Sequence, residues 1–285
     1  MTLAVLLSGQ GGQHPGMFDL TAEWPAAAPV FAAAECVLGQ DPRALVRIPG
    51  ADLHGNRTGQ ILCCVAALAG WTLVQAAHPA RTIVAGYSIG DLAAWGCAGR
   101  FDAETILRLA ATRAEAMDAA AGDGASLAGI RGLPIAAIET LAAAQGGELA
   151  IRNASDSAVI GGPSPALEAL CVEALAAGAL RAVVLPVRPP SHTPLLREAS
   201  QRFEAALAGL QPLRPPPGAP RLISGLDGAP VFDVRAGLSK LARQISHTID
   251  WAACLDACRE YGCDTVLELG PGHALATMAR NAIPE

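Results

Sequence analysis

The sequence predicts an α/β protein with a mostly parallel central sheet and a smaller inserted subdomain, and three observations support this fold class. A short apolar strand at residues 3–7 runs into a glycine-rich turn. A second, at residues 81–85, leads through a sharp turn into a helix. Residues 124–187 alternate short elements with turn signals. A chain of 285 residues has room for one or two domains. We expect a large domain at 1–123 and 188–285, and a small one at 124–187.

The first half of the large domain begins with the buried strand and its turn, Ser8 to Gln13. Glycine-rich turns after a strand present backbone N–H groups in α/β proteins. A long apolar segment then predicts a buried helix, and the strand that follows Pro79 leads into two further helices. The expected elements are a helix at 58–77, a strand at 81–85, a turn and helix at 86–98 and a helix at 103–120.

Residues 124–187 predict six short elements in the order β-α-β-β-α-β, which is the split ferredoxin-like arrangement. Pro189 and Pro190 close this unit. The order is compact enough to stand as an inserted subdomain. The expected elements are a strand at 125–130, a helix at 134–145, strands at 148–153 and 158–161, a helix at 164–177 and a strand at 180–187.

The remaining residues return to the α/β pattern. The proline-rich segment 211–220 predicts a stiff surface crossing, because proline cannot donate to a strand ladder. The expected elements are helices at 194–210, 234–245 and 251–261, a strand at 265–269 and a helix after Gly270-Pro271-Gly272.

Composition excludes several classes of protein. Hydrophobic residues make up 52% and charged residues 16% of the chain, so the core is aliphatic and the chain is not disordered. Nineteen of the twenty basic residues are arginine and form no basic run, so we expect no nucleic-acid partner. The N-terminus resembles no export signal, and the longest apolar stretch, 61–74, is too short to span a bilayer. We therefore expect a cytoplasmic protein without membrane contact.

The eight cysteines form no CxxC pair, and without an export signal we expect them to stay reduced. Cys254, Cys258 and Cys263 could suggest a metal site. Spacing of i, i+4 on a helix more often marks small core residues. We therefore expect no metal.

The strongest chemical motif is Gly86-Tyr87-Ser88-Ile89-Gly90, a G-x-S-x-G pentapeptide between an apolar strand and a helix. This context is that of a nucleophile elbow, in which the serine hydroxyl lies at a helix N-terminus that favours developing negative charge. The N–H of Ile89 is then a natural oxyanion donor. The alternative is an ordinary turn, since the pentapeptide also occurs by chance.

A serine nucleophile needs a base, and six histidines could supply it. His192 is the strongest candidate, because it follows Pro189-Pro190-Ser191 where the small unit rejoins the large one and a cleft is expected. The alternative is a histidine in a surface loop. The other histidines are His14, His54, His78, His247 and His273.

Two further features concern the substrate. Gly9-Gln10-Gly11 ends the first strand, which in a parallel sheet lies beside the elbow and could supply the second oxyanion N–H. Arg113 lies in an otherwise apolar helix. It is either a solvated arginine or a planar fork that binds a substrate carboxylate through two hydrogen bonds.

Taken in order, these motifs make the chain resemble the malonyl-CoA:acyl-carrier-protein acyltransferases along almost its whole length. The family fold is a hydrolase-like α/β domain with an inserted ferredoxin-like subdomain. The matching motifs are G-Q-G at 9–11, the G-x-S-x-G elbow followed by Asp91 and Cys97-Ala98-Gly99, Arg113 then Met117, Asn153 before Val159-Ile160-Gly161-Gly162, Pro190-Ser191-His192 and Leu269-Gly270-Pro271-Gly272.

This resemblance implies a role for each matching residue. Ser88 is the acylated nucleophile, His192 its base and Arg113 the clamp for the malonyl carboxylate. The backbone N–H groups of Gln10 and Ile89 form the oxyanion hole.

The resemblance also implies two supporting positions. Asn153 matches a family asparagine near the pocket. Asp250, just before Trp251, orients the histidine through its backbone carbonyl or its carboxylate, and the sequence does not choose between them.

The resemblance further implies the partners. Malonyl-CoA is the acyl donor and the thiol of an acyl carrier protein is the acceptor. The chain itself holds no cofactor, since the phosphopantetheine-type arm belongs to the carrier.

Two departures from the family pattern point to a subfamily. The residue before the nucleophile is Tyr87 in place of the usual histidine, and the opening segment begins Leu7-Ser8 in place of Phe-Pro. Tyr87 changes the pocket wall, and the G-Y-S elbow resembles the acyltransferase (epsilon) subunit of malonate decarboxylase. That subfamily charges a specialised carrier and assembles with other decarboxylase subunits. The alternative is a transacylase of fatty-acid or polyketide synthesis.

Two rival functions remain at this point. An α/β-hydrolase, either an esterase or a thioesterase, would combine Ser88 with a late histidine such as His273 and an acid such as Asp264. A non-enzymatic scaffold for a carrier protein would keep the fold without the chemistry.

Overall fold

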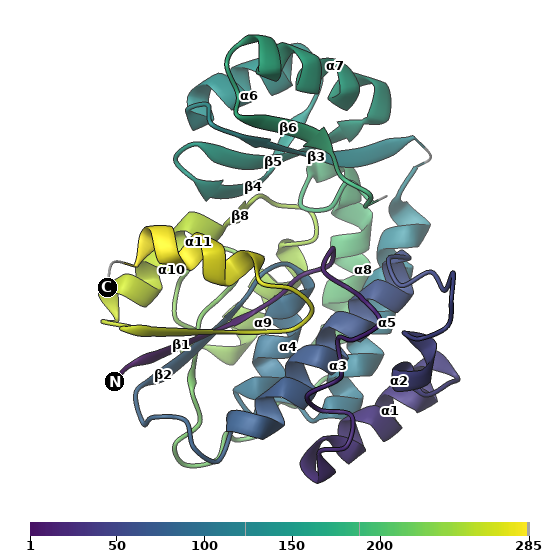
Figure 1. The fold of residues 1–285 in the computed structure, drawn as a ribbon, viewed down its shortest axis with the longest axis vertical. Coiled ribbons are helices and arrows are strands. Elements are labelled where there is room, and N and C mark those ends of the chain that lie inside the picture. Colours follow the sequence, from purple (N-terminus) through teal and green to yellow (C-terminus); the bar gives the residue numbers. More distant parts are fainter. Residues whose placement is uncertain (123, 188, 284–285) are drawn as a thin grey trace.

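The computed structural model describes residues 1–122, 124–187 and 189–283. Figure 1 shows a large part, made of residues 1–122 and 189–283, below a small part made of residues 124–187. The predicted boundaries at 123 and 188 lie outside the described residues.

A parallel four-stranded sheet forms the centre of the large part, in the order β7-β2-β1-β9. Successive side chains of β1 point to opposite faces of the sheet, so each face has its own hydrophobic core. Val5 and Leu7 pack against the helices that follow β1, including α3, α4 and α5, whereas Ala4 and Leu6 pack against the C-terminal helices α10 and α11. The strands are β1 (Leu3–Leu7), β2 (Thr82–Gly86), β7 (Arg221–Leu222) and β9 (Thr265–Leu269).

The helices of the large part cover both faces of this sheet (Figure 1). The central helix is long and apolar enough to cross a bilayer, yet 72% of its apolar window is buried inside the protein, as in a core helix. The helices are α1 (Ala28–Leu38), α2 (Pro42–Leu45), α3 (Asn56–Val74), α4 (Ile89–Cys97), α5 (Ala103–Ala120), α8 (Arg197–Ala208), α9 (Val234–Arg243), α10 (Trp251–Glu260) and α11 (Ala274–Ala282), with 3-10 turns at Pro25–Ala27 and Pro194–Leu196.

The small part has the element order β-α-β-β-α-β, and its strands pair antiparallel in the order β6-β3-β5-β4. Ala128 and Ile130 of β3 face α6 and α7, while Leu127 faces the large part. A strand of the large part, β8 (Ile249–Asp250), extends this sheet beyond β4. The elements are β3 (Ala125–Arg131), α6 (Ile135–Ala144), β4 (Glu148–Ala154), β5 (Ser157–Pro163), α7 (Ser164–Ala176) and β6 (Arg181–Val184).

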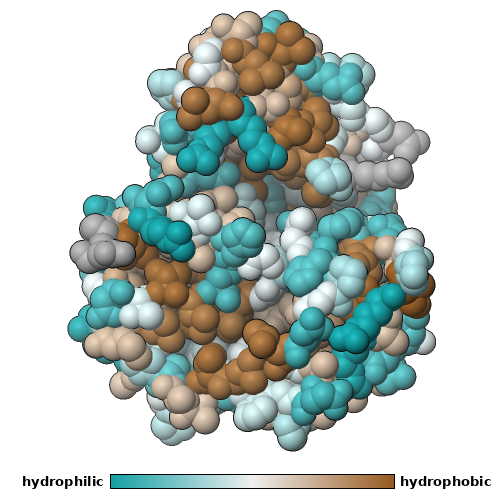
Figure 2. Space-filling model, in the orientation of Figure 1, coloured by the Kyte–Doolittle hydropathy of each residue, from teal (hydrophilic) through white to brown (hydrophobic). Residues whose placement is uncertain are grey.

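Most of the predicted elements are present with ends shifted by a few residues. The predictions for β1, α5 and β9 match to the residue. Two predictions change: β6 ends at Val184, and the helix predicted from 194 starts as a 3-10 turn. Four elements were not predicted, namely α1, α2, β7 and β8. The two parts leave the surface hollowed where they meet, as Figure 2 shows.

Candidate active site

Ser88 lies on a strained turn between β2 and α4. Its backbone has φ 55° and ψ −119°, which few non-glycine residues adopt. The flanking glycines are required by packing: a Cβ at Gly86 would lie 2.0 Å from the carbonyl carbon of Gly90, and one at Gly90 would lie 2.1 Å from the backbone oxygen of Leu7. The predicted nucleophile elbow is therefore present, with Ser88 at the N-terminus of α4.

His192 reaches Ser88 from the loop that joins the small part to α8. Its Nε2 lies 2.9 Å from the Ser88 Oγ, and its Nδ1 lies 2.5 Å from the backbone oxygen of Gln244. A carbonyl oxygen only accepts, so Nδ1 carries the hydrogen and Nε2 is free to accept the serine proton. The side chain is buried rather than in a surface loop.

Burial lowers the pKa of His192 from 6.5 to about 3. The positive charge of Arg113 contributes to this lowering of the pKa, while the hydrogen bond to Gln244 opposes it. The imidazole is therefore neutral at pH 7, which is the state that a general base needs.

The structure corrects the expectation that Asp250 orients the histidine. The Asp250 carboxylate pairs with Arg152 and accepts a hydrogen bond of 3.0 Å from the Ala253 N–H, so it caps α10. The backbone carbonyl of Gln244 orients His192 instead. A backbone carbonyl leaves no signature in side-chain types, so the sequence offered no signal for this contact.

Arg113 is a buried cation beside the nucleophile. It is 1% exposed, which excludes the solvated alternative, and Nη2 lies 3.5 Å from the Ser88 Oγ. Its Nη1 donates to Gln60 Oε1 at 2.6 Å, while Nε has no hydrogen-bond partner among the described residues. Across the described ranges, no carboxylate oxygen lies within 4.0 Å of this guanidinium. Burial lowers the pKa of Arg113 to about 10, so it remains charged at pH 7.

Gln60 is a site residue that the sequence analysis missed. It is fully buried on α3, and it receives Arg113 on one side while donating to Asn56 on the other. An amide directly before the apolar run of α3 was the available signal, because buried polar groups require partners.

The glycine-rich turn after β1 lies against the elbow, as predicted. Leu7 pairs with Gly86 in the parallel ladder, and a Cβ at Gly9 would lie 3.7 Å from the Ser88 Cβ. Within residues 1–122, 124–187 and 189–283, the backbone N–H groups of Gln10 and Ile89 donate to no acceptor. Both donors are thus available to a ligand.

Tyr87 links the elbow to the small part. Its hydroxyl donates to Asn153 Oδ1 on β4 at 3.1 Å, and its ring packs edge-on against Trp251 at a centroid distance of 5.3 Å. Burial raises the pKa of Tyr87, so the hydroxyl keeps its proton. The two residues that the sequence placed at the pocket wall therefore form one contact across the two parts.

The residues of the hydrolase alternative lie elsewhere. Asp264 accepts hydrogen bonds from the Thr2 N–H and Thr265 Oγ1, and His273 precedes α11. In the described part of the chain, neither hydrogen-bonds to Ser88.

The three cysteines considered as a metal site lie at low exposure within one apolar cluster, where burial raises the pKa of each thiol. No group of three metal-ligating side chains occurs in the residues that the structure describes.

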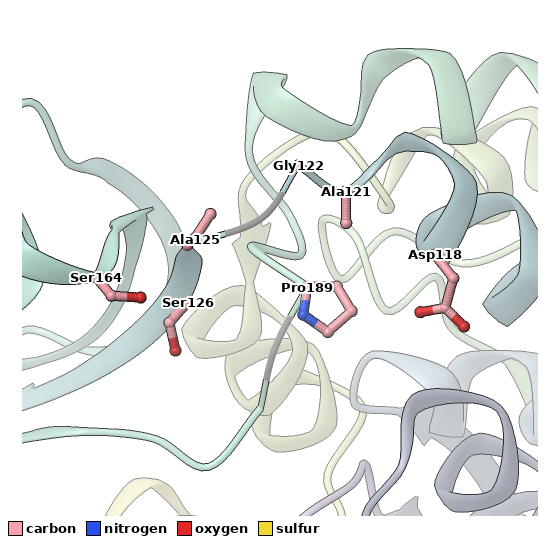
Figure 3. Close-up of a pocket in the computed structure, with 8 residues that line it drawn as sticks. Asp118, Ala121, Gly122, Ala125, Ser126, Ser164 and Pro189 are labelled. Atoms are coloured by element: carbon pink, nitrogen blue, oxygen red, sulfur yellow. The ribbon is translucent and has the colours of Figure 1, made fainter.

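A separate pocket of about 350 Å³ lies at the junction of the two parts, and Ser88 does not line it. Figure 3 shows Ser126 and Ser164 on its small-part side, Asp118 of α5 on the other, and Pro189 between them.

The family model of the acyl transferase domain matches residues 5–280. The chain is 30% identical over 288 residues to the malonyl CoA-acyl carrier protein transacylase of Escherichia coli (strain K12), which covers 98% of this chain and 92% of that protein.

Solved structures give the same result. An acyl-carrier-protein S-malonyltransferase from Burkholderia pseudomallei 1710b is 31% identical with a TM-score of 0.90, covering 99% of this chain and 93% of that one. A type II PKS acyl-carrier protein in complex with its malonyl-transacylase gives 30% identity and a TM-score of 0.91, covering 99% of this chain and 93% of that one.

Proposed function

Because the chain belongs to the acyl transferase domain family, we propose that it transfers a malonyl group from malonyl-CoA to the thiol of an acyl carrier protein. The observation that carries this proposal is Arg113, a buried guanidinium without a carboxylate partner in the described residues, 3.5 Å from the Ser88 Oγ. Burying a charge without an opposite charge costs free energy, and a bound carboxylate partner offsets that cost. The free carboxylate of a malonyl group is such a partner.

The first half-reaction acylates Ser88. The Ser88 hydroxyl gives its proton to His192 Nε2 while Oγ bonds to the thioester carbonyl carbon. The resulting oxyanion accepts hydrogen bonds from the Gln10 and Ile89 N–H groups. When the carbon–sulfur bond breaks, the CoA thiolate takes the proton from His192, and malonyl-Ser88 remains.

The second half-reaction reverses these roles with a new thiol. The thiol on the carrier's phosphopantetheine-type arm gives its proton to His192, and its sulfur attacks the ester carbon. The carbon–oxygen bond to Ser88 then breaks, and Ser88 regains the proton from His192. The acyl-enzyme must resist water between these steps, and the low exposure of His192 supports this.

Arg113 supplies selectivity. Among the described residues, Nε has no hydrogen-bond partner and Nη2 contacts Ser88 Oγ at 3.5 Å, so this edge can donate two hydrogen bonds to a planar carboxylate. An acetyl group would leave the cation unpaired in a buried site, which costs several kcal/mol.

The small part covers this site in our proposal. We assign residues 124–187 as an inserted ferredoxin-like subdomain, and the strand order β6-β3-β5-β4 with two helices on one face supports the assignment. Asn153 on β4 then lines the acyl pocket, held by Tyr87.

The finer proposal concerns the acceptor. Tyr87 at the elbow favours the carrier subunit of malonate decarboxylase, with other decarboxylase subunits as partners. Carriers of fatty-acid or polyketide synthesis are the alternative. A polyketide biosynthesis protein of Burkholderia thailandensis, 32% identical, matches 99% of this chain over 24% of its own length.

The test is acylation followed by transfer. Incubation with malonyl-CoA is expected to add one malonyl group, which peptide mapping locates at Ser88, and the Ser88→Ala variant is expected to add none. Labelling at a cysteine, or an unlabelled wild type, contradicts the proposal. Offering the malonyl-enzyme to a malonate decarboxylase carrier and to a fatty-acid carrier then identifies the acceptor by the faster transfer.

A further inference from the structure

Asp91 is a buried carboxylate that the transfer steps above do not use. It lies in the first turn of α4, three residues after Ser88, and is 1% exposed. Its Oδ2 accepts a hydrogen bond of 2.9 Å from Gln244 Nε2, and its backbone N–H donates to the Ser88 carbonyl at 3.0 Å. Burial of a carboxylate is costly, and burial raises the pKa of Asp91 to about 7.

Gln244 makes two contacts that point in different directions. Its side chain binds Asp91, and its backbone oxygen accepts the hydrogen of His192 Nδ1. The residue follows the end of α9 and is fully buried. A shift of the Gln244 side chain would therefore move the carbonyl that orients the imidazole.

We infer that Asp91 is a positioning residue, which holds Gln244 so that its carbonyl keeps His192 in line with Ser88. Four hydrogen bonds close a ring: Ser88 Oγ to His192 Nε2, His192 Nδ1 to Gln244 O, Gln244 Nε2 to Asp91 Oδ2, and Asp91 N–H to Ser88 O. The nucleophile Ser88 and the carboxylate that holds Gln244 therefore both lie at the first turn of α4. The consequence for malonyl transfer rests on the proposed function.

The contact is poorly arranged for a purely structural role. Within the described residues, Asp91 Oδ1 and Gln244 Oε1 are both buried without a hydrogen-bond partner. Buried polar groups that serve only stability are normally satisfied. The hydrogen bond between Gln244 and Asp91 leaves these two buried oxygens without a partner in the described part of the chain. That it is kept indicates that the position of Gln244 matters.

The experiment measures how fast a fluorophosphonate labels Ser88, separating the maximal rate from the affinity for the probe. Asp91→Ala and Gln244→Met each remove the contact while keeping the Gln244 backbone carbonyl. Each is expected to lower the maximal rate about 10- to 100-fold without changing probe affinity, since a small misplacement of a catalytic group costs about 100-fold. The double variant is expected to be no slower than either single one.

Two further variants separate positioning from stability. Asp91→Asn keeps an oxygen acceptor and is expected to restore the rate to within about three-fold of wild type. Ser200→Ala is the matched control, because it removes another buried hydrogen bond at the end of α9, to the Ala242 carbonyl, outside the ring. Its labelling rate is expected to equal that of wild type.

A folded Asp91→Ala variant labelled at the wild-type rate would overturn the inference, as would losses that multiply in the double variant. Should Asp91→Ala not fold, Gln244→Met decides: a wild-type rate overturns the inference, and a slow rate beside a fast Asp91→Asn supports it. The probe carries no malonyl group and needs no carrier. A protein that transfers no malonyl group but shows these rates rejects the proposed function alone.

Discussion

The large part and the small part differ in the residues that they contribute to the site and in how exposed their side chains are. His192 and Arg113, which reach Ser88 from the large part, are 2% and 1% exposed and are held by hydrogen bonds to other buried residues. The small part contributes Asn153, and its outer surface carries exposed apolar side chains (Figure 2). These are Val172, Leu175, Leu180 and Val183.

This difference separates the residues that contact Ser88 from the part that lies beside them. Proton transfer requires Ser88 and His192 to keep their geometry, and burial of His192 and Arg113 helps to hold it. The small part, which we propose covers the site, can tolerate adjustment, and it reaches the elbow through the hydrogen bond of Tyr87 to Asn153. Substitutions in the large part should therefore cost far more activity than matched ones at the small part.

The largest effect is expected at the base. His192→Ala should lower kcat/KM for malonyl transfer by about 10⁴-fold or more, because removing the base leaves only binding and the oxyanion hole. His273→Ala, the base of the hydrolase alternative, should stay within about two-fold. The measurement is the initial rate of malonyl-CoA thioester loss, and the reverse ranking of the two variants would reject the active-site assignment.

The carboxylate clamp comes next. Arg113→Ala should lower kcat/KM with malonyl-CoA by about 100-fold, the usual cost of truncating one member of a buried charge pair. Acetyl-CoA should gain relative to malonyl-CoA, because no unpaired cation opposes it. Arg152→Ala is the matched control, since Arg152 pairs with Asp250 away from Ser88. An unchanged ratio of malonyl to acetyl transfer would remove Arg113 from the selectivity role.

The pH dependence of stability tests whether burial disfavours the charged form of Asp91. Its pKa is about 7 in the folded protein against 3.8 for a free side chain, so the folded state keeps a proton that the unfolded state has lost between these values. Wild-type stability therefore falls as pH rises through this window. Asp91→Asn lacks this titration, so its advantage should grow to the order of a few kcal/mol by pH 8. Urea unfolding at pH 5, 6, 7 and 8 measures it, and a pH-independent difference contradicts the burial argument.

A smaller effect is expected where the two parts touch. Tyr87→Phe removes the hydroxyl that donates to Asn153 and should lower kcat/KM about two- to ten-fold, the usual worth of one hydrogen bond. Asn153→Ala should do the same, and the double variant should add little. Fluorophosphonate labelling of Ser88 should stay unchanged in all three. A large loss of labelling would mean that the small part supports the chemistry itself.

The smallest functional effect is expected at Asp250. Asp250→Ala removes the cap of α10 and the pair with Arg152, so the free energy of unfolding should fall by about 1 kcal/mol. The rate of Ser88 labelling should not change, because Gln244 orients His192. Slower labelling in a folded Asp250→Ala protein would restore the role that the sequence suggested.

The sequence predicted those parts of the fold that carry a strong local pattern. The apolar strands β1 and β9, and α5 with its Asp102 cap, are matched to the residue because each pattern spans the whole element. The two-residue strands β7 and β8 are too short for any period to appear, and only long-range pairing defines them. Helix α1 is longer, but its pattern is weak because alanine occurs on both its buried and its exposed face.

The same distinction applies to the site, where some residues have a recognisable local pattern and others do not. Ser88 and His192 could be predicted because their side-chain types and flanking residues carry the chemistry. Gln244 could not, because it acts on the histidine through its backbone, which every residue possesses. Asp250 was mistaken for this support because it precedes Trp251, whereas its carboxylate is already occupied by Arg152.

The crowding at Gly86 and Gly90 has a practical consequence for redesign. Any side chain at these two positions would collide with backbone atoms that have no room to retreat, so a library that varies them would mostly yield unfolded proteins. Position 87 between them is different, since its side chain points toward an amide and an indole rather than into the main chain. Attempts to retune the enzyme for another acyl group should therefore begin by randomising that one codon.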